Sequence, residues 1–149
     1  MTESDPIFAA LARATGARLF TVTARDPEAG LFRRIWTSHP EAYPLSGTKP
    51  ALANDWSRQV IDAGKSFVAN RTADFAPYFA DHALINALGC HSVLNVPVRR
   101  ADGEVVGTLN SLDIEDWFTP ARVARIEALV AADAARLASA MQQAIAEGY

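Results

Sequence analysis

Hydrophobic and polar positions along the second half of the chain predict a pair of strands. Two β-rich runs, Ser92–Val98 and Glu104–Leu112, flank the turn Ala101-Asp102-Gly103. An Asp-Gly step between such runs is typical of a hairpin, because glycine adopts positive φ without steric cost. Each run carries one carboxamide near its middle, Asn95 and Asn110. Asparagine is depleted in strands and a buried amide needs hydrogen-bond partners, so this pair indicates a cavity with a polar lining.

The rest of the chain divides into short elements by the same periodicity and by capping residues. We expect a helix from Asp5 to Gly16, strands at Arg18–Ala24 and Leu31–Ser38, an irregular stretch at His39–Pro50, a helix at Asp55–Ala63 capped by Asn54, a strand at Ser66–Asn70, an aromatic connector at Phe75–Phe79 and a helix that Asp81 caps and that runs to Leu88. Three prolines and a glycine argue against regular structure in the irregular stretch. Loops of that length are usually functional, so we expect this one to fold over something.

An apolar stripe predicts one long helix at the end of the chain. It begins at Thr119-Pro120 and runs to about Ala146, with alanines on its other faces. The order of all these elements fits one antiparallel sheet. The terminal helices would cover one face, and loops with short helices would cover the other.

The predicted hairpin resembles the closing hairpin of GAF domains. The matching residues are Gly89, Ser92, Val96-Pro97-Val98 and Gly107-Thr108-Leu109, and the order of elements fits over about residues 5–145. The resemblance implies an α+β, GAF-like (PAS/GAF/profilin-like) fold with a five- to six-stranded antiparallel sheet, as a single domain over residues 1–149. It also implies a ligand pocket between the sheet and its covering loops. GAF domains bind cyclic nucleotides, haem, bilins, amino acids and aromatic effectors, and a few are enzymes, so the ligand and any cofactor stay open.

Composition narrows the class of partner. The chain has 149 residues, 50% of them hydrophobic, which suits one globular domain. A net charge of −3 without a basic block argues against nucleic acid or an anionic membrane as the main partner. The acidic N-terminus lacks the features of a signal peptide, so we expect a cytoplasmic protein. The single cysteine excludes an intramolecular disulfide.

Mapping the pocket implied by the resemblance onto this chain gives a set of candidate ligand-binding residues. The strongest are Tyr43, Trp56, Asn95 and Asn110, and the others are Ser38, Tyr78 and His82. Aromatic walls with a few directed hydrogen bonds suit a small planar or amphipathic ligand. The alternative is that these aromatics pack a lid onto a dry core. Ser92 points to the opposite face of its strand from Asn95, so we expect it to be structural.

Few residues in the sequence suit catalysis. Cys90, His82 and His91 are the candidate nucleophile and acid–base groups, but adjacent strand residues point to opposite faces, which separates Cys90 from His91. The GAF branch that reduces free methionine sulfoxide uses several cysteines, whereas this chain has one. We therefore expect Cys90 to be a buried apolar filler. No metal site is expected from the spacing of the histidines. The run Ser46-Gly47-Thr48-Lys49 could surround an anion.

These patterns favour a small-molecule sensor or ligand-binding protein over an enzyme. We expect a homodimer formed through the long last helix, acting without its own output domain, so that any output would lie in a separate protein. Two alternatives stay open. One is a small cytoplasmic enzyme on the same scaffold, acting on an amide, carbonyl or sulfoxide. The other is a dimerisation module with a filled pocket.

Overall fold

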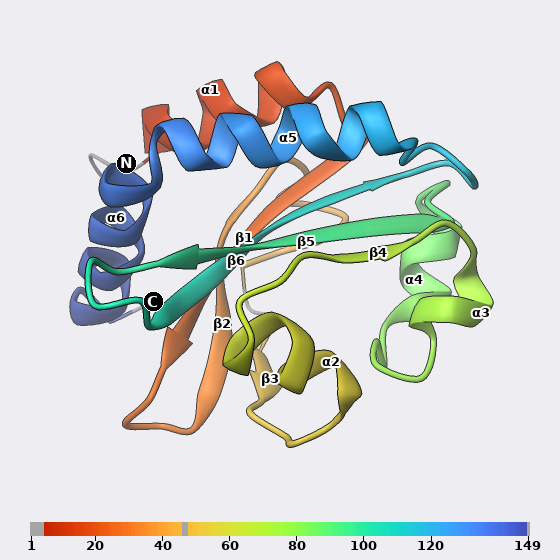
Figure 1. The fold of residues 1–149 in the computed structure, drawn as a ribbon. Helices are drawn as coiled ribbons and strands as arrows, with labels where there is room; N and C mark the ends of the chain where they lie inside the picture. The colour runs from red at the N-terminus through yellow and green to blue at the C-terminus, as the bar shows by residue number, and fades with distance from the viewer. Residues whose placement is uncertain (1–4, 46–47, 149) are drawn as a thin grey trace.

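A computed structural model describes residues 5–45 and 48–148 and shows one antiparallel sheet with helices on both sides (Figure 1). The sheet has six strands in the order β3-β2-β1-β6-β5-β4. Their bounds are β1 Leu19–Asp26, β2 Leu31–Thr37, β3 Thr48–Pro50, β4 Phe67–Ala69, β5 Ser92–Arg99 and β6 Val105–Asp113. This architecture confirms the fold class predicted from the sequence.

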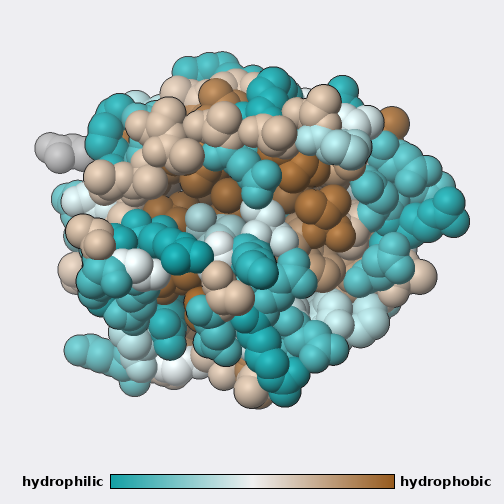
Figure 2. Space-filling model, viewed as in Figure 1, coloured by the Kyte–Doolittle hydropathy of each residue, from teal (hydrophilic) through white to brown (hydrophobic). Residues whose placement is uncertain are grey.

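The helices divide between the two faces of the sheet. On one face lie α1 (Asp5–Thr15), α5 (Pro120–Ala132) and α6 (Ala134–Ala146). On the other side lie α2 (Asp55–Ser57), the π-helical turn η1 (Arg58–Asp62), α3 (Thr72–Phe75) and α4 (His82–Ala87). Figure 2 shows hydrophobic side chains between α5 and the middle strands, with mostly hydrophilic side chains in the lower part of that view.

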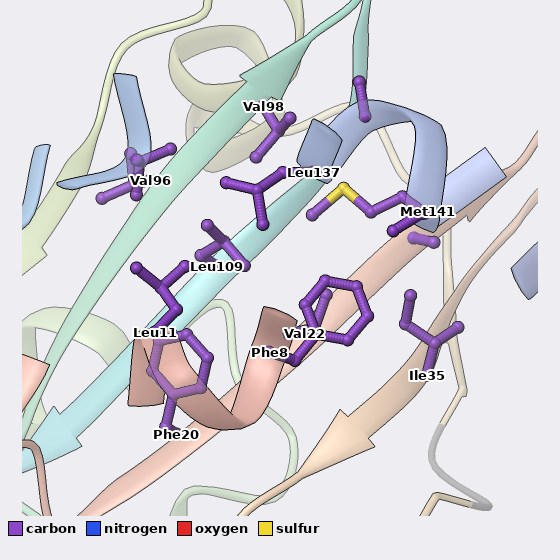
Figure 3. Packing of buried hydrophobic residues seen from close by; sticks show 14 of the residues in the cluster. Phe8, Leu11, Phe20, Val22, Ile35, Val96, Val98, Leu109, Leu137 and Met141 are labelled. Atoms are coloured by element: carbon purple, nitrogen blue, oxygen red, sulfur yellow. The ribbon is translucent and has the colours of Figure 1, made fainter. Parts of the chain in front are cut away.

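Alternation along β1 explains why the sheet has two different faces. Phe20 and Val22 point toward the terminal helices and join the larger core cluster, where they meet Leu137 and Met141 of α6 (Figure 3). Thr21, which lies between them, points to the opposite face. The larger core therefore lies under the terminal helices, and the other face is free to carry polar groups.

Helix α6 lies very close to the sheet at Gly107. A Cβ atom built on Gly107 would lie 2.3 Å from the carbonyl oxygen of Thr23 and 2.9 Å from Sδ of Met141. Only a residue without a side chain fits between β1 and α6 at this point. Gly103 of the predicted hairpin turn has φ +88° instead, and nothing lies within 4 Å of the position that a Cβ atom would take there.

The last helix is the clearest difference from the sequence prediction. It breaks at Asp133 (φ −119°, ψ 18°) into α5 and α6, and Figure 1 shows α6 turned away from the direction of α5. The turn lets Leu137 and Met141 of α6 pack on the sheet, which a straight continuation of α5 would not allow. The expected homodimer was argued from one continuous helix and stays a prediction.

The connecting segments also differ in part from the prediction. Within the stretch expected to be irregular, Thr48–Pro50 forms the edge strand β3, which pairs with β2 so that Lys49 lies opposite Phe32. An edge strand tolerates proline because its outward N–H groups need no partner. Ser46 and Gly47 lie outside the described residues. Asn54 caps the next helix as expected, accepting from the backbone N–H of Ser57, but this helix continues as the π-helical turn η1.

Candidate functional site

A cavity of about 670 Å³ lies on the second face of the sheet. Strands β1, β2, β5 and β6 form its floor, and β3, α2 and the segment 76–84 form its walls. Apolar and aromatic side chains make up most of the walls; they come from Phe32, Tyr43, Leu52, Trp56, Tyr78, Phe79 and Leu84. A hollow of this size and composition is typical of a small-molecule site.

The floor of the cavity carries a row of polar side chains across three strands. Thr21 of β1 lies opposite Asn110 of β6, which lies opposite Asn95 of β5. The Nδ2 atom of Asn95 donates to Oδ1 of Asn110 at 2.7 Å. The Nδ2 atom of Asn110 donates in turn to Oγ1 of Thr21 at 3.1 Å and of Thr23 at 2.9 Å. The row therefore cross-links the strands through side chains as well as through the backbone.

The same row fixes one wall of the cavity. The indole Nε1 of Trp56 donates to Oδ1 of Asn95 at 2.9 Å, and Trp56 is 6% exposed. Its ring also meets the ring of Phe32 edge to face, with centroids 6.3 Å apart. Most of the hydrogen-bonding capacity of the two amides is thus used within the protein. The two amides therefore hold the floor and the Trp56 wall of the cavity in place.

A second cluster ties the Tyr43 segment to the residue just before α4. The guanidinium of Arg34 lies 3.6 Å above the centre of the Tyr43 ring, and its Nη1 donates to the carbonyl oxygen of Pro44 at 2.6 Å. Asp81 accepts a hydrogen bond from the hydroxyl of Tyr43 and lies 3.7 Å from Nη2 of Arg34. Burial raises the pKa of Tyr43 far above its ordinary value, so this hydroxyl stays protonated and acts as a donor.

The other cation of the cavity is Lys49 on β3. Its Nζ atom lies 4.3 Å from the centre of the Trp56 ring and 4.8 Å from the centre of the Phe79 ring. Ring faces attract cations, so the two aromatics hold the ammonium inside the cavity mouth. Burial lowers the pKa of Lys49, while the nearby Asp81 carboxylate opposes that shift.

The structure brings five of the seven predicted ligand-binding residues together on this cavity: Tyr43, Trp56, Tyr78, Asn95 and Asn110. Ser38 and His82 do not line it. The hydroxyl of Ser38 accepts from the backbone N–H of Phe20 at 2.9 Å, because the end of β2 turns it back onto β1. Nδ1 of His82 lies 2.8 Å from the carbonyl oxygen of Phe79 in the preceding turn.

Several lining residues did not figure among the predicted ligand-binding residues. They include Arg34, Lys49 and Asp81, with Thr21, Thr23 and Thr108 on the floor. Thr21 and Thr23 alternate with Phe20 and Val22, so the pattern of β1 could have placed them beside the amides. Lys49 belongs to the run considered as an anion site. Asp81 was expected to cap α4, but its side chain makes no capping bond because it faces Tyr43 instead.

None of the candidate catalytic residues Cys90, His82 and His91 is among the described residues that line the cavity. Cys90 is fully buried in the smaller core cluster with Phe75 and Ile85, and burial raises the pKa of its thiol to about 11. Nδ1 of His91 lies 3.4 Å from Oγ1 of Thr72, and among the described residues no hydrogen bond joins this ring to the thiol of Cys90. Ser92 donates to the carbonyl oxygens of Asp113 and Ile114 near the start of its strand, a structural role.

We expect Cys90 to be almost unreactive toward Ellman's reagent in the folded protein at pH 8. A buried thiol with a raised pKa offers little thiolate, so the native reaction should be at least about 100-fold slower than in guanidinium. The rate of nitrothiobenzoate release, measured with and without denaturant, checks this. Equal rates would mean that the thiol is accessible, and would favour Cys90 as a nucleophile again.

Two features are absent from residues 5–45 and 48–148. None of the helices described there is long and apolar enough to cross a membrane. Within the same ranges, no group of three or more His, Cys, Asp or Glu side chains is placed to hold a metal ion.

Comparison with known proteins gives the family. The family model of the GAF domain matches residues 2–138. A comparison with curated proteins gives no match. Among solved structures, the GAF domain/HD domain protein from Geobacter sulfurreducens is similar, with a TM-score of 0.73 at 18% identity over 95% of each chain.

Two further solved structures share the fold. The GAF domain of a two-component sensor histidine kinase from Bacillus halodurans gives a TM-score of 0.70 at 15% identity, over 100% of this chain and 99% of that one. The blue-light-absorbing form of the PixJ GAF domain from Thermosynechococcus elongatus gives 0.64 at 14% identity, over 97% and 89%. Identities this low show the fold alone. Because the family model matches almost the whole length of this chain, the chain belongs to the GAF domain family, a family of ligand-binding and sensory modules.

Proposed function

We propose that this GAF domain is a small-molecule sensor or ligand-binding protein whose ligand is a planar, amphipathic metabolite. The observation that carries the proposal is the cavity of about 670 Å³ over the sheet. Its volume falls in the range of sites that enclose a drug-sized molecule. The same volume argues against the alternative of a dimerisation module with a filled pocket.

The lining supports a planar ligand. Trp56 and Phe79 present aromatic surface to the cavity, and Trp56 is held in orientation by Asn95. Aromatic walls that are already fixed lose little conformational freedom when a flat molecule packs against them. The threonine and amide groups of the floor offer a polar end to an otherwise apolar space.

The lining favours binding over catalysis. The titratable side chains that line the cavity in the described part of the chain are Arg34, Tyr43, Lys49, Tyr78 and Asp81. Arg34, Tyr43 and Asp81 already satisfy one another, and the raised pKa of Tyr43 keeps its hydroxyl protonated, so that no phenolate is available to act as a base. A nucleophile next to a general base is the minimum for acyl-transfer chemistry, and these groups do not supply one.

Fluorescence titration with N-phenyl-1-naphthylamine tests the proposal. This neutral, planar probe should saturate a single site in the folded protein and raise its melting temperature, as linkage requires. Trp56→Leu removes an aromatic wall and should weaken probe binding about tenfold, since a stacked aromatic contributes on the order of 1 kcal/mol or more.

The matched control is Trp36→Leu. Trp36 packs against Phe20 in the larger core cluster, on the opposite face of the sheet. Trp36→Leu should leave the affinity for the probe within about twofold of wild type, because substitutions at distant sites act independently. No saturable binding to the wild-type protein, or an equal loss in the two variants, would overturn the proposed function.

A further inference from the structure

We propose that the ligand carries one anionic group, and that Lys49 is the residue that receives it. This inference rests on the proposed function, because it assigns the charge of a molecule held in the same cavity. The ligand class is then a monoanionic amphipath, such as an organic acid with a flat apolar body. The balance of charges around the cavity leads to this assignment.

Three charged side chains line the cavity in the described part of the chain: Arg34, Lys49 and Asp81. Arg34 is already engaged, since it pairs with Asp81 at 3.7 Å and donates to the carbonyl oxygen of Pro44. Asp81 also accepts from Tyr43. One negative charge therefore offsets one of two positive charges, and the lining keeps a single positive charge in excess.

The contacts of each side chain assign the excess positive charge of the lining to Lys49. Among residues 5–45 and 48–148, no salt bridge joins its ammonium group to a carboxylate within 4.0 Å, and its Nζ atom lies over the rings of Trp56 and Phe79. The carboxylate of Asp81 is near enough to favour the charged form of Lys49, but it is already paired with Arg34. Ring faces attract a cation but leave its hydrogen-bond donors unused. An anion in the cavity would accept those hydrogen bonds and stay close to both aromatic walls.

The position of Lys49 in the fold explains how it reaches the cavity. The register of β3 against β2 places Lys49 opposite Phe32, and both side chains line the cavity. Burial disfavours the charged ammonium, which is why its pKa is lowered. An incoming anion offsets that burial cost, so the charged group is prepared for a charged partner.

The aromatic walls and Lys49 together define the chemistry of the ligand. A flat apolar body packs against Trp56 and Phe79, and one anionic group lies beside Lys49 near the edge strand. A second anionic group would face Asp81, and the described part of the lining offers it no second unpaired cation, so a dianion such as a phosphate monoester fits this balance less well. Lys49 acts here as a specificity-determining residue, with the aromatic walls supplying most of the contact area.

A matched pair of probes separates charge from shape. The first probe is 8-anilinonaphthalene-1-sulfonate, and the second, N-phenyl-1-naphthylamine, is the same fluorophore without the sulfonate. Lys49→Met removes the charge and keeps an unbranched apolar side chain. It should weaken binding of the sulfonate probe about tenfold, the effect of losing one hydrogen bond between charged groups, and change binding of the neutral probe less than about twofold.

Two control variants sharpen the test. Lys65→Met removes the chain's other lysine, which does not line this cavity, and should leave both affinities unchanged. Lys49→Arg keeps the charge and should restore affinity for the sulfonate probe to within about threefold of wild type. Raising salt should weaken binding of the sulfonate probe to wild type and barely affect binding to Lys49→Met.

The outcomes distinguish this inference from the proposed function. Equal losses of the two probes in Lys49→Met, or equal losses of the sulfonate probe in Lys49→Met and Lys65→Met, would overturn the assignment of Lys49. The proposed function would survive that result, because the neutral probe would still bind the wild-type cavity. Failure of the neutral probe to bind wild type at all would overturn both.

Discussion

Gly107→Ala is expected to lower the free energy of unfolding by about 3 kcal/mol, the upper end of the usual cost of overpacking, because one of the neighbours in the way is backbone. The added methyl group would lie 2.3 Å from the backbone carbonyl oxygen of Thr23, which cannot rotate away. It would also press on Sδ of Met141 in α6. Either β1 or α6 must move outward, and both contribute to the larger core. Urea unfolding followed by circular dichroism measures the change.

Gly103→Ala provides the control. Gly103 has φ +88° in the hairpin turn, with nothing within 4 Å of an added Cβ, so alanine there meets backbone strain alone. That strain should cost about 1 kcal/mol. If alanine at Gly107 lowered the free energy of unfolding no more than alanine at Gly103, then β1 and α6 would not lie as close to Gly107 as the structure places them.

Asn95→Leu is expected to lower the free energy of unfolding by about 2 kcal/mol, the cost of leaving buried polar groups unpaired. The change removes the acceptor of the Trp56 indole N–H and the donor to Oδ1 of Asn110. Asn95 is 2% exposed, so water does not readily replace it. In a chain of this size the melting temperature should fall by about 6 °C.

A double-mutant cycle with Trp56→Phe isolates the indole hydrogen bond. Phenylalanine keeps an aromatic ring against Phe32 but cannot donate to Asn95. Both substitutions remove the same hydrogen bond. The double variant should therefore lose about 1 kcal/mol less free energy of unfolding than the sum of the losses in the two single variants. Fully additive costs would contradict the view that Asn95 holds the Trp56 wall.

Much of the fold follows from local rules in the sequence. Alternation along β1 separates Phe20 and Val22 from Thr21, and the Asp102-Gly103 step forms the predicted turn between β5 and β6. Asn54 caps a helix as expected. Each of these features depends on residues close together in the chain, which is why pattern alone could predict them.

Features that depend on distant packing were not predictable in this way. The apolar stripe continues past Asp133, but α6 departs there from the direction of α5. The chain turns because Leu137 and Met141 pack on the sheet, a contact that the stripe alone does not indicate. Strand β3 forms in a stretch with prolines because β2 offers a free edge. Local sequence preferences indicate neither the packing of α6 on the sheet nor the pairing of β3 with β2.

The candidate site shows the same division. Asn95 and Asn110 stand out in the sequence because amides are unusual in strands, and the structure pairs them on the cavity floor. The charged cluster is different. Tyr43 and Asp81 are 38 positions apart and meet only after the fold forms, so neither residue type nor spacing indicates their contact.

Uptake of a small planar molecule by the cavity beside Trp56 can be observed directly by ¹⁹F NMR. The protein is labelled with 5-fluorotryptophan and titrated with N-phenyl-1-naphthylamine. The chain has three tryptophans: Trp56 lines the cavity, while Trp36 and Trp117 pack against the larger core cluster. We expect that only the Trp56 resonance, assigned with Trp56→Phe, shifts and saturates with the probe. An unmoved Trp56 resonance at saturating probe, with or without shifts at Trp36 or Trp117, would contradict binding in this cavity.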